Sequence, residues 1–394
     1  MNHPLVSIII PTYNRKEYIQ QAIDSVIVQT YPHYEIIVID DGSTDGTGEA
    51  LVARYNDRII YHRQENQGES VARNWGINVA RGEYVGFLDD DDIYLPRMLE
   101  VTIEILEQHP DIGFVSVQYY VTNEAGDILY TPLLSNSCDG YITAEEFLLG
   151  DSTVPSNSIL RRKVIDQAGY FDTTIRYGED AEFFRKIFAQ FRAYFLAEPL
   201  MAMRVGEARQ SGRILDPAKA KLRFDDQTAA LSRIEDDPVF VPYIPKLCGL
   251  INANYAFNLI ANGETSKAEP ILKHVFTLEP SDWFYKEIMC GLFLQYIEAL
   301  DDEQGIAAVM KFAQQIFTAV DGTRAFRQEW RRKIIGKFHL NRFFKQAFQE
   351  EWAEMRLSYF RAIANDLVCL KNRGIHSFMI KSFIGPRLLR TRVF

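Results

Sequence analysis

The fold of this chain is decided by one stretch, Tyr84-Val85-Gly86-Phe87-Leu88-Asp89-Asp90-Asp91-Asp92. Its apolar part predicts a short buried strand, and the four acids follow where that strand leaves the sheet. Adjacent carboxylates repel one another, most strongly near low-dielectric packing. We therefore expect a divalent cation, bound through oxygen, that also holds phosphates. The alternative is a loop that caps the next helix, expected at Leu95 to His109, although one or two acids would suffice for that.

Length and composition are those of a globular protein. The chain has 394 residues, which is enough for two or three domains. Of these residues, 47% are apolar and 24% are charged. A polar start leads straight into a strand, so we expect no signal peptide. No apolar run reaches the ~20 residues of a membrane span. The four cysteines show no metal-binding spacing. Together these features predict a reduced, cytoplasmic protein.

Strand and helix patterns alternate up to about His109. Continuous apolar strands separated by helices predict an α/β fold with a mostly parallel sheet covered on both faces. Asn14 has the position of an N-cap for the first helix. Ligands of such sheets bind outside the carboxyl ends of the strands. Three polar clusters fall at such ends, namely Thr12-Tyr13-Asn14, Asp40-Asp41 and Asp89 to Asp92.

The pattern changes beyond residue 113. Gly113 to Thr122 and Ile128 to Pro132 predict a hairpin. A second acidic cluster, Gly178-Glu179-Asp180, opens a helix, where acids are common whether or not they belong to a site. From Pro217 onward the pattern is helical. Within residues 252 to 280 the spacing matches one tetratricopeptide hairpin, and an ordinary helix pair is an equal alternative.

We therefore divide the chain into three parts. Residues 1–216 form an α/β domain, 217–323 an all-α region, and 324–394 a basic helical tail. The tail carries 16 Lys and Arg against 5 Asp and Glu, whereas the net charge of the whole chain is −10. This asymmetry indicates that the tail meets something anionic.

Short motifs follow one another in a fixed order from residue 4 to about 215, and each is weak alone. They are Val6-Ser7-Ile8-Ile9-Ile10-Pro11-Thr12-Tyr13-Asn14, Ile39-Asp40-Asp41-Gly42-Ser43-Thr44-Asp45, Asn66-Gln67-Gly68 with Ala72-Arg73-Asn74, Ala80-Arg81-Gly82-Glu83-Tyr84, Phe87-Leu88 with the four acids, Leu160-Arg161-Arg162 with Gly169-Tyr170-Phe171-Asp172, and Gly178-Glu179-Asp180. Their order resembles an inverting glycosyltransferase of family 2. The resemblance implies the GT-A fold, a Rossmann-like nucleotide-sugar-binding fold.

The resemblance also implies a donor site. Its members lie near the nucleotide and are Pro11, Thr12, Tyr13, Asn14, Asp41, Arg73, Asp89 and Asp90. Thr12 and Tyr13 would contact the base and Asp41 its imide, while Arg73 would act as a counter-charge. Because uracil and thymine both offer a ring N–H to a carboxylate, a UDP-sugar is favoured and a dTDP-sugar is the second choice.

The family's Asp-X-Asp motif falls on Asp89 to Asp91. Asp91 is then the expected direct ligand of Mn²⁺ or Mg²⁺, with Asp89 second, and Asp92 is expected to cap the next helix. The metal would stabilise the departing diphosphate as a Lewis acid. The resemblance assigns the general base to Asp180, which would take the proton of an acceptor hydroxyl as it attacks C1. Because the loop from Arg204 to Ser211 has no His, a diphosphate contact there would fall to Arg204 or Arg209.

Partners follow from the same resemblance. It implies a glycan or lipid-linked acceptor, polysaccharide biosynthesis at the cell envelope, and a peripheral position at the cytoplasmic face of the membrane. Nucleic acid is not expected as a partner. An inactive GT-A-fold binding or scaffold protein is one alternative. A sugar nucleotidyltransferase is another, but it would need a Gly-rich loop with Lys or Arg where the chain has Pro11-Thr12-Tyr13-Asn14.

The basic tail generates a first prediction, because its Lys and Arg residues alternate with aromatic and aliphatic ones. We expect the protein to pellet with anionic liposomes at low salt and to be released at high salt, since each basic residue adds about 1 kcal/mol near an anionic surface. Removal of the residues after Gly374 should weaken this binding. Equal recovery in the supernatant with anionic and neutral vesicles would instead assign the tail to packing on the rest of the protein.

Overall fold

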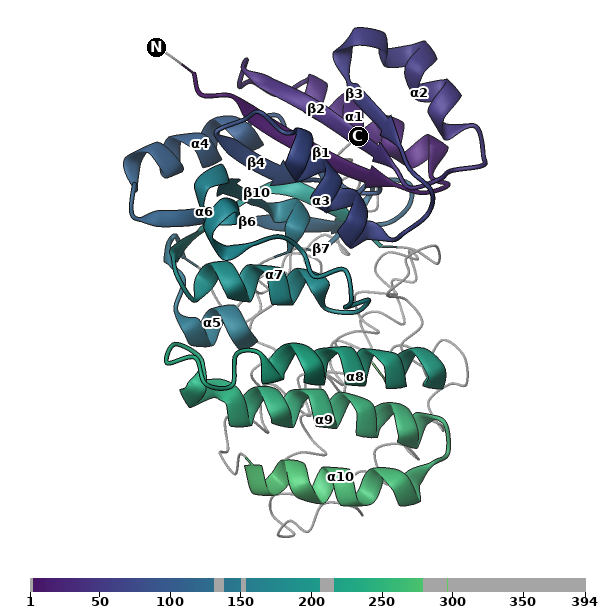
Figure 1. The fold of residues 1–394 in the computed structure, drawn as a ribbon, viewed down its shortest axis with the longest axis vertical. Coiled ribbons are helices and arrows are strands. Elements are labelled where there is room, and N and C mark those ends of the chain that lie inside the picture. The colour runs from purple at the N-terminus through teal and green to yellow at the C-terminus, as the bar shows by residue number, and fades with distance from the viewer. Residues whose placement is uncertain (1–2, 131–137, 150–153, 206–215, 279–295, 297–394) are drawn as a thin grey trace, which may run out of the picture. The chain divides into compact units, whose positions relative to one another are not determined.

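A computed structural model describes residues 3–130, 138–149, 154–205, 216–278 and Tyr296 (Figure 1). The chain divides into two compact units. Of the described residues, 3–205 and 236–241 belong to the first unit, and the others belong to the second. The basic tail and Arg209 lie outside the described residues.

The described part of the first unit is built on one sheet of ten strands. The order is β3-β2-β1-β4-β9-β6-β10-β5, with β7 beside β6 and β8 beside β10. The strands are β1 (Val6–Thr12), β2 (Tyr34–Asp40), β3 (Ile60–Arg63), β4 (Tyr84–Phe87), β5 (Ile93–Tyr94), β6 (Ile112–Thr122), β7 (Ile128–Tyr130), β8 (Gly140–Tyr141), β9 (Ser158–Arg161) and β10 (Arg192–Arg204).

The direction of the strands changes at β9. The first four spatial neighbours, β3, β2, β1 and β4, are parallel, as the alternating sequence pattern predicts. Strand β9 then runs antiparallel to both β4 and β6, and β10 runs parallel to β6. The parallel part places the carboxyl ends of β1, β2 and β4 at one edge, where ligands of such sheets bind.

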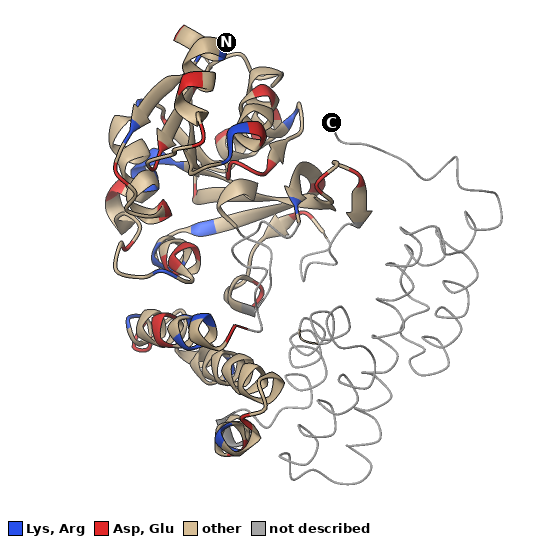
Figure 2. Ribbon diagram, turned by 90° about the vertical axis from the view of Figure 1, so that its right-hand side faces the viewer, with Lys and Arg blue, Asp and Glu red and all other residues tan. Residues whose placement is uncertain are grey.

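Helices pack on the sheet, α3 on β1 and β2, and α4 on β6 (Figure 1). Those of the first unit are α1 (Lys16–Ile27), α2 (Thr47–Tyr55), α3 (Glu69–Val79), α4 (Met98–Gln108), α5 (Ala144–Leu149), α6 (Arg162–Ala168) and α7 (Glu179–Phe188), with short 3₁₀ turns at Asn56–Arg58 and Pro155–Asn157. Acidic and basic residues are intermixed over the described helices and strands (Figure 2).

The predicted cap of α1 is wrong. Helix α1 begins at Lys16, and Asn14 lies two residues earlier with φ 53°. Its side-chain Oδ1 accepts from Thr44 N at 2.7 Å, and its own N–H donates to Ser43 Oγ at 2.9 Å. Asn tolerates this left-handed conformation better than most residues. Asn14 therefore joins the ends of β1 and β2 instead of starting a helix.

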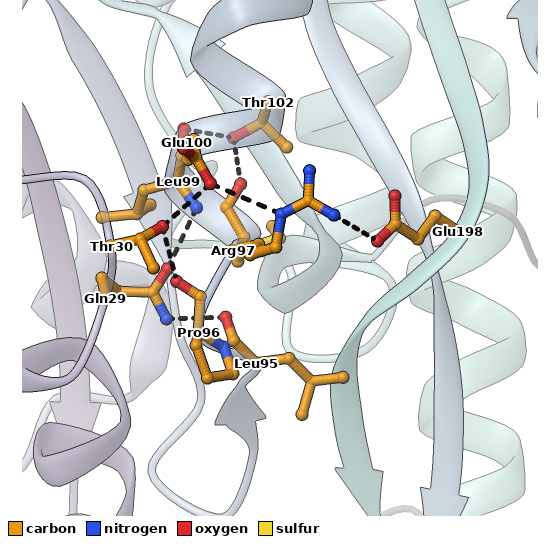
Figure 3. A network of polar contacts seen from close by, with 10 residues as sticks. Gln29, Thr30, Leu95, Pro96, Arg97, Leu99, Glu100, Thr102 and Glu198 are labelled. Atoms are coloured by element: carbon orange, nitrogen blue, oxygen red, sulfur yellow. Dashed lines mark hydrogen bonds and ion pairs between the residues drawn. The ribbon is translucent and has the colours of Figure 1, made fainter.

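The cap of α4 also differs from the expectation, because Asp92 lies six residues before the helix. Gln29 takes the role instead (Figure 3). Its Oε1 accepts from Leu99 N at 3.0 Å, and its Nε2 donates to Leu95 O at 2.8 Å. Thr30 adds a bond to Glu100 at 3.0 Å. A side chain more than 60 positions away in sequence thus satisfies a free helix N–H.

The described part of the second unit is helical, as predicted for the region after Pro217. It contains α8 (Pro217–Ser232), α9 (Ile244–Ala261) and α10 (Thr265–Leu278). The chain passes from the first unit to the second within the 3₁₀ turn Val241–Tyr243. Helices α9 and α10 form the expected hairpin, with Ala256, Leu259, Ala268 and Leu272 buried. None of the helices in the described ranges is long and apolar enough to cross a membrane.

The close approach of α3 to β1 generates a stability prediction. A Cβ at Gly76 would lie 2.3 Å from Ile9 Cγ2, and Ile9 is fully buried in β1. Overpacking of this kind costs about 1–3 kcal/mol, which outweighs the gain of up to about 1 kcal/mol from Gly to Ala in a helix. We expect Gly76→Ala to lower the melting temperature. Gly140→Ala, where a Cβ meets nothing within 4 Å, is the matched control and should melt like the unmodified protein. Equal melting of both variants would contradict the prediction.

Candidate functional site

The three predicted polar clusters meet at the carboxyl edge of the parallel strands. Asp41 N donates to Thr12 O at 2.8 Å, which ties the end of β2 to the end of β1. Thr12 Oγ1 donates to Asp90 Oδ2 at 2.7 Å, which ties β1 to the turn after β4. Pro11 precedes Thr12 within β1, and Tyr13, the next residue, is 45% exposed.

Asp41 is buried and holds the loop that leads to α3. Its Oδ1 accepts from Gln64 Nε2 at 2.6 Å and from Gln67 N at 2.9 Å, and its Oδ2 accepts from Gly68 N at 2.8 Å. A carboxylate has about four acceptor positions. One position is therefore left for a further donor such as a ring N–H, and its pairing with a base remains a prediction.

The four acids after β4 form one tight turn. Asp92 N donates to Asp89 O at 3.0 Å and closes this turn. Asp89 pairs with Arg73 at 2.8 Å, and Asp91 pairs with Arg15 at 3.0 Å. Asp90 accepts from Thr12, and Asp92 Oδ1 accepts from Arg204 N at 3.2 Å. Each carboxylate thus has its own partner. The protein itself therefore supplies much of the compensation that the sequence led us to expect from a cation.

The acids of the turn differ in environment. Burial, followed by repulsion from Asp91, raises the pKa of Asp90 to about 8. A carboxyl with this pKa is mostly protonated at neutral pH. The side chains of Asp89 and Asp91 are 29% and 13% exposed, so both remain reachable from solvent.

Arg204 ends β10, and its side chain is buried near the same turn. Its Nη2 donates to Gln21 Oε1 at 2.8 Å, and its guanidinium lies 4.7 Å from the centre of the Tyr18 ring. Burial lowers the pKa of Arg204. A diphosphate contact from Arg204 remains a prediction.

Helix α7 brings the second acidic cluster to the site. The helix begins at Glu179, after Gly178 with φ +85°, and Asp180 is the second helical residue. Glu179 Oε1 accepts from Arg73 Nη1 at 3.4 Å, and Arg73 also pairs with Asp89. Burial, followed by repulsion from Asp180, raises the pKa of Glu179 to about 7. The residue before Asp180 is therefore linked to the turn after β4 through one arginine.

Arg73 is itself buried, with 3% of its side chain exposed. Burial alone would lower the pKa of Arg73, but Asp89, Glu69 and Glu179 together raise it. The guanidinium therefore stays charged and paired with carboxylates of the protein. Its predicted role as a counter-charge near the nucleotide remains a prediction.

Asp89 and Asp91 suit a hard divalent cation in chemistry, because carboxylate oxygens are the ligands that Mg²⁺ and Mn²⁺ prefer. Within the described ranges, no group of three or more His, Cys, Asp or Glu side chains is placed to hold a metal. Mg²⁺ is commonly bound by one or two carboxylates together with substrate phosphates. The residues present therefore fit a metal that needs the donor diphosphate to complete its ligands.

Sequence reasoning missed two contributors to the site. Arg15 was not singled out, although it follows the Thr12-Tyr13-Asn14 cluster directly and pairs with Asp91. Glu179 stands at a helix start and within the motif Gly178-Glu179-Asp180 but was given no role of its own, although its side chain is 15% exposed and faces Arg73. A rule that seeks basic partners for each acid of a dense cluster would have found Arg15. No local pattern pairs Glu179 with Arg73, 106 positions away.

Known proteins resemble this chain, and the family match includes the ends of β1, β2 and β4. The model of glycosyl transferase family 2 matches residues 7–169. A Rickettsia typhi protein named as an uncharacterised glycosyltransferase is 34% identical over 231 residues, covering 54% of this chain and 68% of that protein. TuaG of Bacillus subtilis, whose name refers to teichuronic acid biosynthesis, is 37% identical over 159 residues, covering 40% of this chain and 59% of TuaG.

A solved structure agrees at the level of the fold. The crystal structure of S. aureus TarS 1–349 in complex with UDP-GlcNAc has a TM-score of 0.52 and 18% sequence identity, and the match covers 90% of each chain. The fold is the GT-A fold expected from the sequence motifs. The family match spans the strands whose ends form the site, and the relative from Rickettsia is matched over two thirds of its length. This chain therefore belongs to glycosyltransferase family 2 and is a glycosyltransferase.

Proposed function

We propose that this enzyme is a metal-dependent, inverting glycosyltransferase that moves a sugar from a nucleoside diphosphate to a hydroxyl of a glycan or lipid-linked acceptor. One observation carries the proposal: the ends of β1, β2 and β4 and the start of α7 meet in one chain of contacts. It runs from Asp41 through Thr12 to Asp90, and from Asp89 through Arg73 to Glu179. A nucleotide bound at the strand ends would then lie beside Asp180.

The ends of β1 and β2 suit a uracil or thymine base. The exposed ring of Tyr13 offers a face for stacking. Asp41 has an acceptor position left for the imide N–H, and the loop Gln64–Gly68 holds its carboxylate in place. Both bases carry that N–H, so we favour a UDP-sugar as donor and place a dTDP-sugar second. The complex of the TarS neighbour with UDP-GlcNAc supports a nucleotide-sugar donor of the uridine class.

Asp91 and Asp89 would hold Mn²⁺ or Mg²⁺ with the donor diphosphate, and the metal would stabilise the negative charge of the leaving diphosphate. Arg15 holds Asp91, and Arg73 holds Asp89, so both carboxylates are fixed in place. Burial and the neighbouring Asp91 raise the pKa of Asp90, which limits the negative charge that this residue adds to the turn.

Asp180 is our candidate for the general base. It lies in the first turn of α7, and aromatic packing fixes the body of that helix. The ring of Phe183 stacks on Phe171 with centres 3.9 Å apart and meets Phe87 of β4 edge-to-face with centres 5.8 Å apart. An acceptor hydroxyl within hydrogen-bond reach of Asp180 would lose its proton as it attacks C1. Attack opposite the leaving diphosphate inverts the configuration at C1.

The acceptor side of the proposal rests on a relative and on the basic tail. The name of TuaG, which refers to teichuronic acid biosynthesis, supports an acceptor among the polysaccharides of a cell envelope. A lipid-linked acceptor would bring the enzyme to a membrane surface, which is where the basic tail would act. Liposome binding therefore tests this part of the proposal.

The metal site generates the next prediction. We expect Asp91→Asn to keep the fold and to lower release of UDP from UDP-sugars in the presence of Mn²⁺ by about 100-fold, because one ligand and one charge are lost beside the leaving group. EDTA should have the same effect on the unmodified protein. Asp166→Asn is the matched control, since Asp166 pairs with Arg162 at 2.9 Å on the surface of α6. Full activity of Asp91→Asn, or of the unmodified protein in EDTA, would contradict the metal site.

The base generates a separate prediction. Asp180→Asn should bind UDP and Mn²⁺ as the unmodified protein does, while turnover falls by about 100-fold or more, the scale of a lost general base. Calorimetry with UDP and Mn²⁺ measures the first quantity, and UDP release from the donor measures the second. Loss of UDP binding in this variant would place Asp180 in the nucleotide site instead.

A further inference from the structure

Arg73 lies at the centre of a cluster of carboxylates that come from different segments. Its Nη2 is 2.8 Å from Asp89 Oδ1 and 3.2 Å from Glu69 Oε2, and its Nη1 is 3.4 Å from Glu179 Oε1. Glu69 lies in the first turn of α3, Asp89 follows β4, and Glu179 begins α7. One buried cation thus contacts three carboxyl groups.

Two of these carboxyl groups belong to different parts of the proposed reaction, one to the donor side and one to the side of the base. Asp89 belongs to the turn that would hold the metal and the diphosphate. Glu179 is the residue before Asp180, the proposed base. The guanidinium of Arg73 contacts both, and it is planar, so its two nitrogens fix the directions of both partners at once.

Helix α3, which carries Arg73, is also connected to α7 through Asn74 and Phe171. The next residue, Asn74, makes two bonds to the backbone of Phe171, with Nδ2 donating to O at 2.8 Å and Oδ1 accepting from N at 2.9 Å. Phe171 then stacks on Phe183 at 3.9 Å between ring centres. This second connection holds α7 from Phe183 onward, one turn after Asp180.

The first turn of α7 has fewer constraints. It follows Gly178, whose backbone is left-handed and which has no side chain to cap the helix, and the bond from Ala181 N to Asp180 Oδ1 at 2.7 Å stays within the turn. Helix ends open more readily than helix interiors because their first N–H groups lack partners within the helix. The pair of Glu179 with Arg73 ties this turn to the β4 side of the site.

We propose that Arg73 and Glu179 are positioning residues, which hold the first turn of α7, and with it Asp180, at a fixed place relative to Asp89. This inference rests on the proposed function only in taking Asp180 as the base. The pair acts through Asp180 and does not itself exchange a proton with the substrate. When the pair is weakened, we expect turnover to fall while donor affinity stays nearly unchanged. A small displacement of a general base lowers the rate of the reaction strongly.

Substitution of Glu179 tests the inference. Glu179→Gln keeps the shape of the side chain but removes the carboxyl group that pairs with Arg73. We expect turnover, measured as UDP release from the UDP-sugar that the unmodified protein hydrolyses fastest in a panel, to fall by about 10-fold. The dissociation constant of UDP with Mn²⁺ should change by less than about twofold. Amide hydrogen exchange over residues 179–182 should become faster, because the first turn loses its tie.

A matched control lies one turn further along the same helix. Glu182 is also buried and pairs with Lys186 at 3.2 Å, so Glu182→Gln makes the same substitution on α7 at a residue that is not paired with Arg73. It should leave turnover within about twofold of the unmodified value. If Glu182→Gln lowers turnover as much as Glu179→Gln does, the effect belongs to the stability of the helix, and the inference is overturned.

A double-mutant cycle separates positioning from direct catalysis. Arg73→Lys keeps the charge but not the two-sided contact, and Arg54→Lys, which alters the surface pair with Asp24, controls for the change itself. If the two residues act as a pair, the loss in Arg73→Lys with Glu179→Gln is smaller than the product of the single losses. Multiplicative losses would show that Glu179 acts independently of Arg73 and would overturn the inference.

Failure of the inference can be told apart from failure of the proposed base. Asp180→Asn is measured in the same assays. If Asp180→Asn is inactive while Glu179→Gln has full turnover and unchanged exchange, the base stands and the positioning pair falls. If Asp180→Asn is fully active, the base assignment falls, and faster exchange in Glu179→Gln still reports whether the pair holds the first turn of α7.

Discussion

Repulsion among four consecutive carboxylates after β4 is the constraint on which the rest of this site depends. Asp89 to Asp92 occupy one tight turn, so their charges cannot move apart along the chain. In the folded chain, each of the four side chains contacts a different partner. These partners come from β1, from the segment before α1, from α3 and from the end of β10. Elements distant in sequence are thereby required to meet at one edge of the sheet.

This arrangement changes the physical meaning of the acidic run. In isolation the run calls for an external cation, because nothing nearby in sequence balances it. In the folded chain Arg15 and Arg73 balance two of the acids, and a raised pKa leaves Asp90 mostly neutral at pH 7. The metal that we propose would then join carboxylates that are already oriented. Preorganisation of this kind reduces the reorganisation needed when charge develops on a leaving diphosphate.

Helix α7 is also held in place by contacts within the protein. Aromatic packing of Phe183 against Phe171 fixes the body of the helix, and an ion pair fixes its first turn. Apolar packing is not directional, whereas a paired guanidinium specifies the direction of its partners. The two kinds of contact therefore have different tasks: one holds α7 on the sheet, and the other orients the end that carries Asp180.

The sequence by itself determined the strands β1, β2 and β4, their parallel order and the edge at which their polar ends gather, because apolar periodicity and turn chemistry are local signals. It also determined the family, through the order of the motifs. Only the tertiary structure decided that Gln29 caps α4, that Asn14 bridges two loops, and that Glu179 faces Arg73. These contacts join residues between 30 and 106 positions apart. Local propensity carries no information on such pairs, since they form only when the sheet brings its strand ends together.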